Sequence, residues 1–167
     1  RLEALGRLRL VLVLSGYMKN ELVATGLEPG QVRVLPPFVH RLGIDQPAAA
    51  KEHFLLAGRL VERKGILKAL AAATIWRAPL PLVIAGDGPL AGKVERAACQ
   101  SQGRVRFVGW ADRPQMSRLL AKAAGLILPS LWAEPLGIAG LEALACARPQ
   151  ALARVHPHGD QGAELRV

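Results

Sequence analysis

Short apolar runs alternate along most of the chain with longer segments in which apolar residues recur at helical spacing. The runs are typical of buried strands, and the segments between them are typical of amphipathic helices. The predicted strands are His53–Ala57, Leu80–Ala85, Val105–Val108 and Gly125–Leu128, with a weaker one at Gln150–Val155. The predicted helices are Gly65–Trp76, Leu90–Gln102, Pro114–Ala123 and Gly137–Cys146. This alternation predicts an α/β fold, a Rossmann-like doubly wound parallel sheet with helices on both faces.

The front of the chain has its own pattern of strand, helix and strand. Apolar runs at Leu10–Leu14 and Val32–Leu35 predict two strands, and the segment Tyr17–Thr25 between them predicts a helix. Two prolines at positions 36 and 37 then stop regular structure, and the segment through Pro47 to Ala50 is typical of a linker or a domain edge. We therefore expect one domain edge with its linker at 1–47 and a second domain at 48–167.

Composition excludes several classes of protein. At 167 residues and 51% apolar the chain can close one sizeable core, and no apolar run approaches the roughly 18 residues of a membrane-spanning helix. The charge of +9 would attract polyanions, but the basic residues are scattered and aromatics make up 4%, which disfavours a nucleic-acid face. Cys99 and Cys146 lack neighbours at metal-ligand spacing, so we expect buried reduced thiols, no metal site and a cytoplasmic protein.

The loop between the first strand and helix of the second domain could bind phosphate. It contains Arg59 and Lys64, and ligands of doubly wound sheets bind where such loops lead into helix N-termini. Arg offers a planar fork to phosphate oxygens, Lys a mobile charge and the helix start backbone N–H groups, so the loop can hold a diphosphate. An ordinary basic turn with solvated side chains explains the same residues.

The next loop, Gly86-Asp87-Gly88-Pro89, is rich in glycine. Positive φ at Gly86 and Gly88 would let a ligand approach the backbone closely. A tight turn that needs glycine explains the pair equally well. The loop alone leaves both interpretations open.

Two carboxylates, Glu134 and Glu142, lie eight positions apart around the start of the last predicted helix. If that helix begins near Leu136, Glu134 precedes it and Glu142 lies about two turns in. A carboxylate can accept two hydrogen bonds from the vicinal hydroxyls of a ribose or hexose. The alternative is that Glu134 complements the helix dipole and Glu142 is solvated.

Four motifs follow one another in a fixed order along the second domain. They are Gly58-Arg59-Leu60 with Lys64-Gly65, Val83 to Pro89, Val105 to Gly109, and Pro129-Ser130 followed by Glu134 and Glu142. In that order and spacing they resemble the C-terminal domain of family-4 retaining glycosyltransferases, which have two Rossmann-like domains in the GT-B arrangement. The resemblance runs from about residue 10 to residue 149, and residues 1–47 are similar to the tail of that family's N-terminal acceptor domain.

The resemblance implies a role for each of these residues. Arg59 and Lys64 would bind the donor diphosphate and stabilise its growing charge as the glycosidic bond breaks, and Glu134 would contact the transferred sugar. The other implied contacts are Glu142 at the ribose, the backbone of Gly137 and Ile138 at the distal phosphate, the turn at Gly86 and Gly88, and the strand end Val108 and Gly109 beside the base.

The resemblance also implies the reaction and its partners. We expect hexose transfer from a UDP-, GDP- or ADP-sugar to a glycan or lipid-linked acceptor, with retention of anomeric configuration. No metal or other cofactor is required in this scheme. The acceptor would bind in the N-terminal domain, and the basic surface would suit peripheral contact with the anionic inner face of a membrane.

The two ends of the chain depart from the family pattern. The chain begins mid-protein and stops at Val167, before the family's final helices, so we expect it to transfer nothing alone. The alternative function is a non-catalytic nucleotide-binding or partner-binding module. Near the C-terminus, a surface turn explains His156, His158 and Asp160 better than a metal cluster does. The departures are His40 for Asp, Ala147 for Gly, and Gln150 within a predicted apolar strand.

Overall fold

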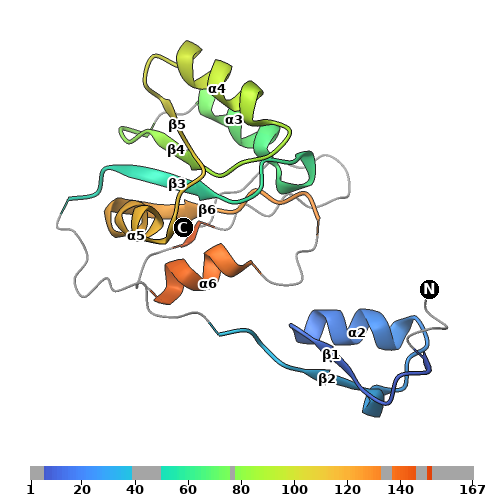
Figure 1. Cartoon of the computed structure of the whole chain (residues 1–167). Helices are drawn as coiled ribbons and strands as arrows, with labels where there is room; N and C mark the ends of the chain where they lie inside the picture. Colours follow the sequence, from blue (N-terminus) through green and yellow to red (C-terminus); the bar gives the residue numbers. More distant parts are fainter. Residues whose placement is uncertain (1–5, 39–49, 76–77, 133–136, 146–149, 152–167) are drawn as a thin grey trace. The chain divides into compact units, whose positions relative to one another are not determined.

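The computed structural model describes residues 6–38, 50–75, 78–132, 137–145 and 150–151. The described chain divides into two compact units, one containing residues 6–38 and the other containing the sheet that begins at His53. Figure 1 labels the elements of both units.

The first unit is a strand, a helix and a strand. Strands β1 (Val11–Val13) and β2 (Val32–Val34) pair in parallel, and helix α2 (Gly16–Ala24) connects them, followed by the short 3₁₀ turn η1 (Pro29–Gln31). Ser15 caps α2, because its side chain accepts a hydrogen bond from the backbone N–H of Met18 at 3.3 Å. The predicted order of these three elements is confirmed.

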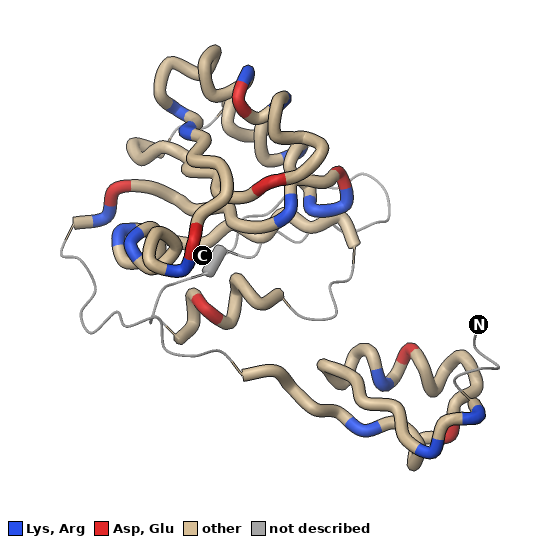
Figure 2. Tube along the Cα trace, viewed as in Figure 1, with Lys and Arg blue, Asp and Glu red and all other residues tan. Residues whose placement is uncertain are grey.

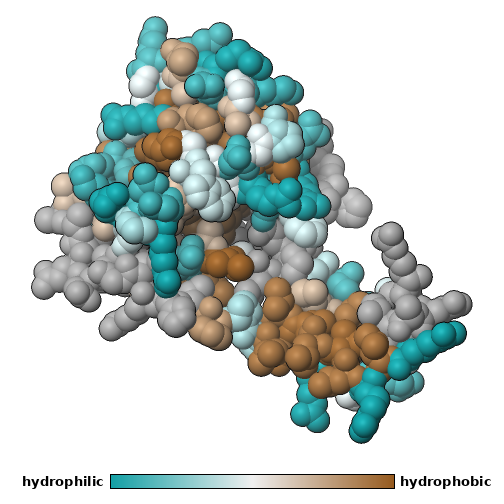
Figure 3. All heavy atoms as spheres, viewed as in Figure 1, coloured by the Kyte–Doolittle hydropathy of each residue, from teal (hydrophilic) through white to brown (hydrophobic). Residues whose placement is uncertain are grey.

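Among the described residues of the first unit, helix α2 packs on one face of this two-stranded sheet. Val13 and Val32 are buried on the side where the side chains of α2 pack. The alternate positions on β1 and directly beside its two ends are exposed, and Figure 3 shows apolar surface over this unit. The exposed fractions are 47% for Leu10, 56% for Leu12 and 44% for Leu14.

The second unit contains a five-stranded parallel sheet. Its strands are β3 (His53–Ala57), β4 (Leu82–Ala85), β5 (Val105–Gly109), β6 (Ala123–Ile127) and β7 (Gln150–Ala151). They lie in the order β5-β4-β3-β6-β7, so the direction of winding reverses between β3 and β6. This is the doubly wound arrangement, and the predicted fold class is confirmed.

Helices cover both faces of the sheet (Figure 1). Side chains of neighbouring strand residues point to opposite faces, so Leu56 and Ile84 pack with α3 and α4, whereas Leu55 and Val83 pack with α5 and α6. Each buried aliphatic side chain of this size contributes about 1.5–3 kcal/mol to folding. The helices are η2 (Glu62–Lys64, 3₁₀), α3 (Ile66–Thr74), α4 (Ala91–Gln100), α5 (Arg113–Lys122) and α6 (Ile138–Ala145).

Two sequence predictions about this unit were wrong. Ala123, predicted as the end of a helix, is the first residue of β6. Helix α5 begins at Arg113, ends at Lys122 and passes directly into the strand. A capping box fixes that beginning: Gln115 N–H donates to the Asp112 carboxylate at 2.8 Å, and Asp112 N–H donates to Gln115 Oε1 at 2.9 Å. Cys99 is exposed rather than buried.

The loops after β3, β4 and β5 are joined by their backbones. Gly86 has φ of 147°, and a Cβ at this position would lie 1.8 Å from the carbonyl oxygen of Gly58. Gly86 N–H donates to the carbonyl of Gly109 at 2.7 Å, and Leu60 N–H donates to that of Asp87 at 2.8 Å. The requirement for glycine at position 86 therefore comes from the protein's own backbone.

We expect Gly86→Ala to lower the free energy of unfolding by about 3 kcal/mol or more, since it combines a steric clash with a strained backbone. Gly103→Ala is the matched control, because Gly103 also has positive φ but no atom lies within 4 Å of its added Cβ. The control should lose about 1 kcal/mol. Urea unfolding measures both, and equal losses would contradict a backbone contact at Gly86.

Candidate functional site

The switch point of the sheet lies between β3 and β6, where the connections of neighbouring strands turn to opposite faces. The loop after β3 contains Arg59, which is exposed, and Lys64, which is half-buried. The turn η2 orders this loop: Lys64 N–H donates to Val61 at 3.0 Å and Gly65 N–H donates to Glu62 at 2.8 Å. Arg59 and Lys64 are thus carried by a hydrogen-bonded loop at the carboxyl end of β3.

Helix α3 begins directly after this loop without a side-chain cap. Its N-cap is Gly65, which has φ of 71° and no side chain to accept hydrogen bonds from the first turn. The first N–H groups of a helix have no partners within the helix, and together they favour a negative charge. The arrangement of Arg59, Lys64 and this helix start can therefore attract an anion.

The loop after β6 is packed against the loop after β3. A Cβ on Gly65 would lie 1.8 Å from the carbonyl oxygen of Pro129, so only glycine permits this approach. Leu131 N–H donates to the carbonyl of Arg63 at 2.9 Å. The guanidinium of Arg63 also lies over the ring of Trp132, 5.2 Å from its centroid. Sequence reasoning missed these partners, since no local pattern links residues so far apart.

Glu142 lies on α6, on the same face of the sheet as α5. Helix α6 begins at Ile138, so Glu142 is about one turn into the helix and not two as the sequence suggested. Burial raises the pKa of the Glu142 carboxyl, and the nearby Arg113 guanidinium opposes that shift. Arg113, the first residue of α5, was missed by sequence reasoning.

The glycines after β4 have structural partners. A Cβ on Gly88 would lie 2.7 Å from the carbonyl oxygen of Leu60, as the one on Gly86 would meet Gly58. These contacts agree with the interpretation of a tight turn, and ligand contact at Gly86 and Gly88 stays a prediction. At the end of β5, Val108 is 46% exposed and Gly109 has φ of 68°.

Other predicted residues are not placed in this site. Glu134 lies outside the described residues, as do His40, Ala147, His156, His158 and Asp160. Gly137 groups with the first unit, and Ile138 is exposed at the first position of α6. Their predicted contacts with a sugar and a distal phosphate stay predictions.

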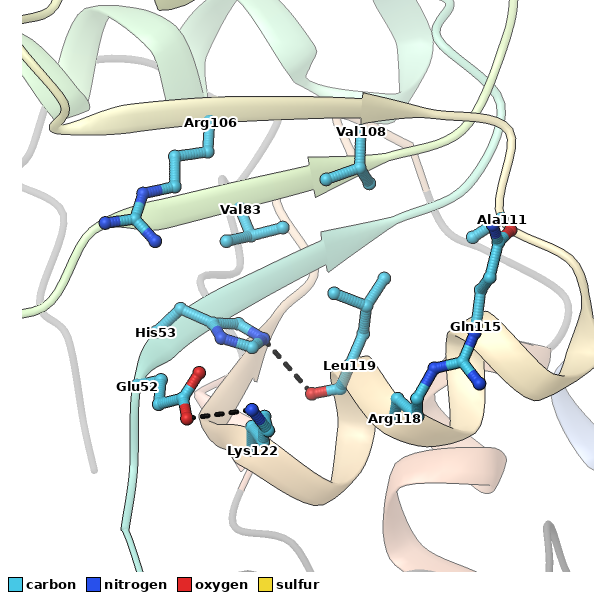
Figure 4. Close-up of a pocket in the computed structure, with 10 residues that line it drawn as sticks. All are labelled: Glu52, His53, Val83, Arg106, Val108, Ala111, Gln115, Arg118, Leu119 and Lys122. Carbon is cyan, nitrogen blue, oxygen red and sulfur yellow. Dashed lines mark hydrogen bonds and ion pairs between the residues drawn. The ribbon is translucent and has the colours of Figure 1, made fainter.

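A separate cleft of about 400 Å³ lies between α5 and the sheet (Figure 4). We call it the α5 cleft, and it includes Val108 but none of Arg59, Lys64 and Glu142. Arg59 and Lys64 thus lie in one loop after β3, and Glu142 lies on α6. Residues that line the α5 cleft include His53, Arg106, Val108, Arg118, Leu119 and Lys122.

Lys and Arg residues are spread over the helices and loops of both units (Figure 2). Within the part of the chain that the structure describes, no helix has the length and apolar character needed to cross a membrane.

Several known proteins are similar to this chain in sequence or in fold. The family model described as glycosyl transferases group 1 matches residues 51–164. The α-maltose-1-phosphate synthase of Mycobacterium tuberculosis is 32% identical over 166 residues, which cover 82% of this chain and 41% of that enzyme. The chain thus spans about two-fifths of the length of this relative.

Solved structures give the same result for the fold. Sucrose-phosphate synthase from Thermosynechococcus elongatus superposes with a TM-score of 0.74 and 26% identity, covering 90% of this chain and 42% of that one. Anabaena HepE in complex with UDP-glucose gives a TM-score of 0.73 and 17% identity, covering 89% and 46%. These neighbours share the fold of this chain. Since the family model covers most of the sheet domain, the chain belongs to the group 1 glycosyltransferase family.

Proposed function

We propose that this chain is the donor-binding half of a retaining glycosyltransferase that moves a hexose from a nucleotide-diphosphate sugar to a glycan or lipid-linked acceptor. One observation carries the proposal: the loops after β3 and β6 are fixed to each other at the switch point through Gly65 and Pro129. Arg59, Lys64 and the uncapped start of α3 lie on the first of these loops. A diphosphate is the ligand that such a set of cations and N–H groups suits.

The rest of the donor would extend from that diphosphate. Glu142 would accept hydrogen bonds from the ribose hydroxyls, and the Arg113 guanidinium would help to keep its carboxyl charged despite burial. The backbone at Gly137 and Ile138 would bind the distal phosphate. The base would lie beside the end of β5, and Glu134 would contact the hexose.

The chemistry of this proposal is electrostatic. Breaking the anomeric C–O bond leaves a cation-like sugar and a nucleoside diphosphate on which negative charge accumulates. Arg59 and Lys64 would stabilise that charge, so no metal ion is required. The acceptor hydroxyl would attack the same face that the diphosphate leaves, and a phosphate oxygen would take its proton. Configuration is then retained without a covalent enzyme intermediate.

Residues 1–47 would be the end of the acceptor domain with its linker, and residues 48–167 the donor domain. The exposed face of β1 supports this proposal, because leucines at alternate positions are typical of a sheet face that packs against further structure. The whole enzyme would work in the cytoplasm, with peripheral contact to anionic lipid through its basic surface.

Calorimetric titration of the chain with UDP-, GDP- and ADP-glucose tests the proposal. We expect saturable binding of at least one of them, also in the presence of EDTA. Arg59→Ala and Glu142→Ala should each weaken it about tenfold, the effect of removing one hydrogen bond to a charged group. Arg96→Ala, an exposed arginine on α4, is the control and should change affinity less than twofold.

Equal weakening by Arg59→Ala and Arg96→Ala, with binding unchanged or tightened in Glu142→Ala, would reduce the interaction to net charge and contradict the assigned roles. Absence of saturable binding for every donor would favour a module that binds a protein partner instead.

The burial of Glu142 leads to a second prediction. Its pKa in the folded chain is raised above the ordinary value of 4.5, so folding takes up protons and stability is lost as the pH rises above that value. Glu142→Gln should therefore be more stable than the wild type at pH 7, and the advantage should shrink towards pH 4.5. Urea unfolding at both pH values measures this difference.

Glu95→Gln, an exposed carboxylate on α4, is the control for removing one negative charge from a basic chain. A Glu142→Gln variant less stable than both the wild type and this control at pH 7 would contradict a carboxylate kept for ligand binding.

A further inference from the structure

A second cleft, of about 330 Å³, lies between helices α3 and α4, which cover the same face of the sheet (Figure 1). We call it the α3–α4 cleft. Its volume falls within the range of roughly 300–1,000 Å³ typical of ligand pockets. Leu70, Ala73 and Thr74, which share one face of α3, line it on one side. Ala97 and Gln100 line it from α4. The aliphatic side chains give the cleft an apolar wall.

The α3–α4 cleft lies at the amino edge of the sheet. Val105, the first residue of β5, is part of its lining. Strands β3, β4 and β5 are parallel, and the loop that contains Arg59 and Lys64 follows the carboxyl end of β3. A ligand in the cleft would therefore lie at the opposite edge from the proposed diphosphate site and would contact neither of these two residues.

The cleft has little net charge to offer a ligand. Among the described residues that line it, Arg104 is the charged one. Its Nη1 donates to the carbonyl of Thr74 at 3.1 Å, at the C-terminal end of α3, where the helix dipole is negative. The guanidinium and the helix end compensate each other, so the cleft favours a neutral ligand over an anion.

Two carboxamides in the lining are available to a ligand. Gln100 and Gln102 are exposed, and within the described part of the chain neither side chain has a hydrogen-bond partner. The hydroxyl of Ser101 is already used, because it accepts from Val105 N–H at 3.0 Å and donates to the carbonyl of Ala98 at 2.8 Å. A carboxamide both donates and accepts, so it can bind hydroxyl groups, which do the same.

The backbone at Gln102 is strained. Its φ is 53°, a positive value that no other described non-glycine residue has. Gln102 follows Ser101, the C-cap of α4, at the position where helices commonly use glycine because other side chains are strained there. Strained residues cluster at functional sites, where a side chain is needed in one place. The carboxamide of Gln102 is therefore present at a cost in stability.

We propose that the α3–α4 cleft binds a neutral sugar. Hydroxyl groups of the sugar pair with the carboxamides of Gln100 and Gln102, and its C–H face lies against Leu70 and Ala73. The site is separate from the proposed donor site, so a sugar bound here does not compete with a nucleotide sugar.

Amide NMR of the ¹⁵N-labelled chain tests this site residue by residue. The probes are maltose, glucose, glucose 6-phosphate and cyclohexanol, which separate hydroxyl groups from charge and from apolar contact. Maltose and glucose should give saturable shifts at the amides of Thr74, Gln102 and Val105. Cyclohexanol, which has a single hydroxyl, should bind about fivefold more weakly than glucose. Glucose 6-phosphate should bind at these amides no more tightly than glucose.

Variants of Gln102 separate a binding role from a structural one. Gln102→Ala and Gln102→Gly should each weaken maltose binding, followed at Thr74 and Val105, about fivefold. Gln102→Gly should at the same time raise the midpoint of urea unfolding, since glycine adopts positive φ without strain. Glu95→Ala is the control, because Glu95 is exposed on α4 outside the cleft, and it should change the affinity less than twofold.

Several results would overturn the inference. A Gln102→Gly variant that is more stable and binds maltose with unchanged affinity would leave the carboxamide without a role in binding. Cyclohexanol binding as tightly as glucose would leave an apolar cleft without hydroxyl recognition, and tighter binding of glucose 6-phosphate would mean recognition of an anion. Maltose shifts confined to residues 59–66 would place the sugar at the switch point, and absence of saturable shifts would exclude the site. Each result is independent of whether the chain binds a nucleotide sugar.

Discussion

Close backbone contact between loops at the carboxyl edge of the sheet is the constraint on which the rest of this structure depends. Gly65 lies against the carbonyl of Pro129, and Gly86 lies against that of Gly58, at distances that leave no room for a Cβ. Conformational entropy normally keeps such loops mobile, but these contacts hold them in one arrangement. Preorganised groups cost less to bring to a ligand, so a loop held in this way would favour the proposed binding of a diphosphate by Arg59 and Lys64.

The doubly wound topology separates two kinds of surface. At the edge, loops of neighbouring strands converge and present backbone N–H groups and cations to an anion. On the face covered by α5, side chains from the strands and from α5 line the α5 cleft, among them the ion pair of Lys122 with Glu52. Val108 at the end of β5 lies where the two surfaces meet, since it lines the α5 cleft and is followed by Gly109, whose carbonyl accepts from Gly86.

The sequence predicted the sheet well and the contacts between loops poorly. The spacing of apolar residues within a few positions is enough to predict a strand or a helix, so the strand His53–Ala57 was predicted with its correct ends. The alternation of such strands with helices then predicted the doubly wound fold class. The partners of Gly65 and Arg63 lie more than sixty residues away along the chain, and no local pattern encodes them. Arg113 beside Glu142 was missed for the same reason. Arg106, which lines the α5 cleft, is a charged residue among the apolar residues of a strand. Such a charge indicates a position that faces solvent or a ligand, so the sequence contained this one indication.

The central claim is that the loop of Arg59 and Lys64, the start of α3 and helix α6 together bind a nucleoside diphosphate. The most direct measurement is an amide shift map of the ¹⁵N-labelled chain titrated with UDP, GDP and ADP. The account predicts that the largest shifts occur at residues 59–66 and in the first turn of α6, at 138–142. Shifts confined to α5, or to residues 6–38 of the first unit, would contradict it.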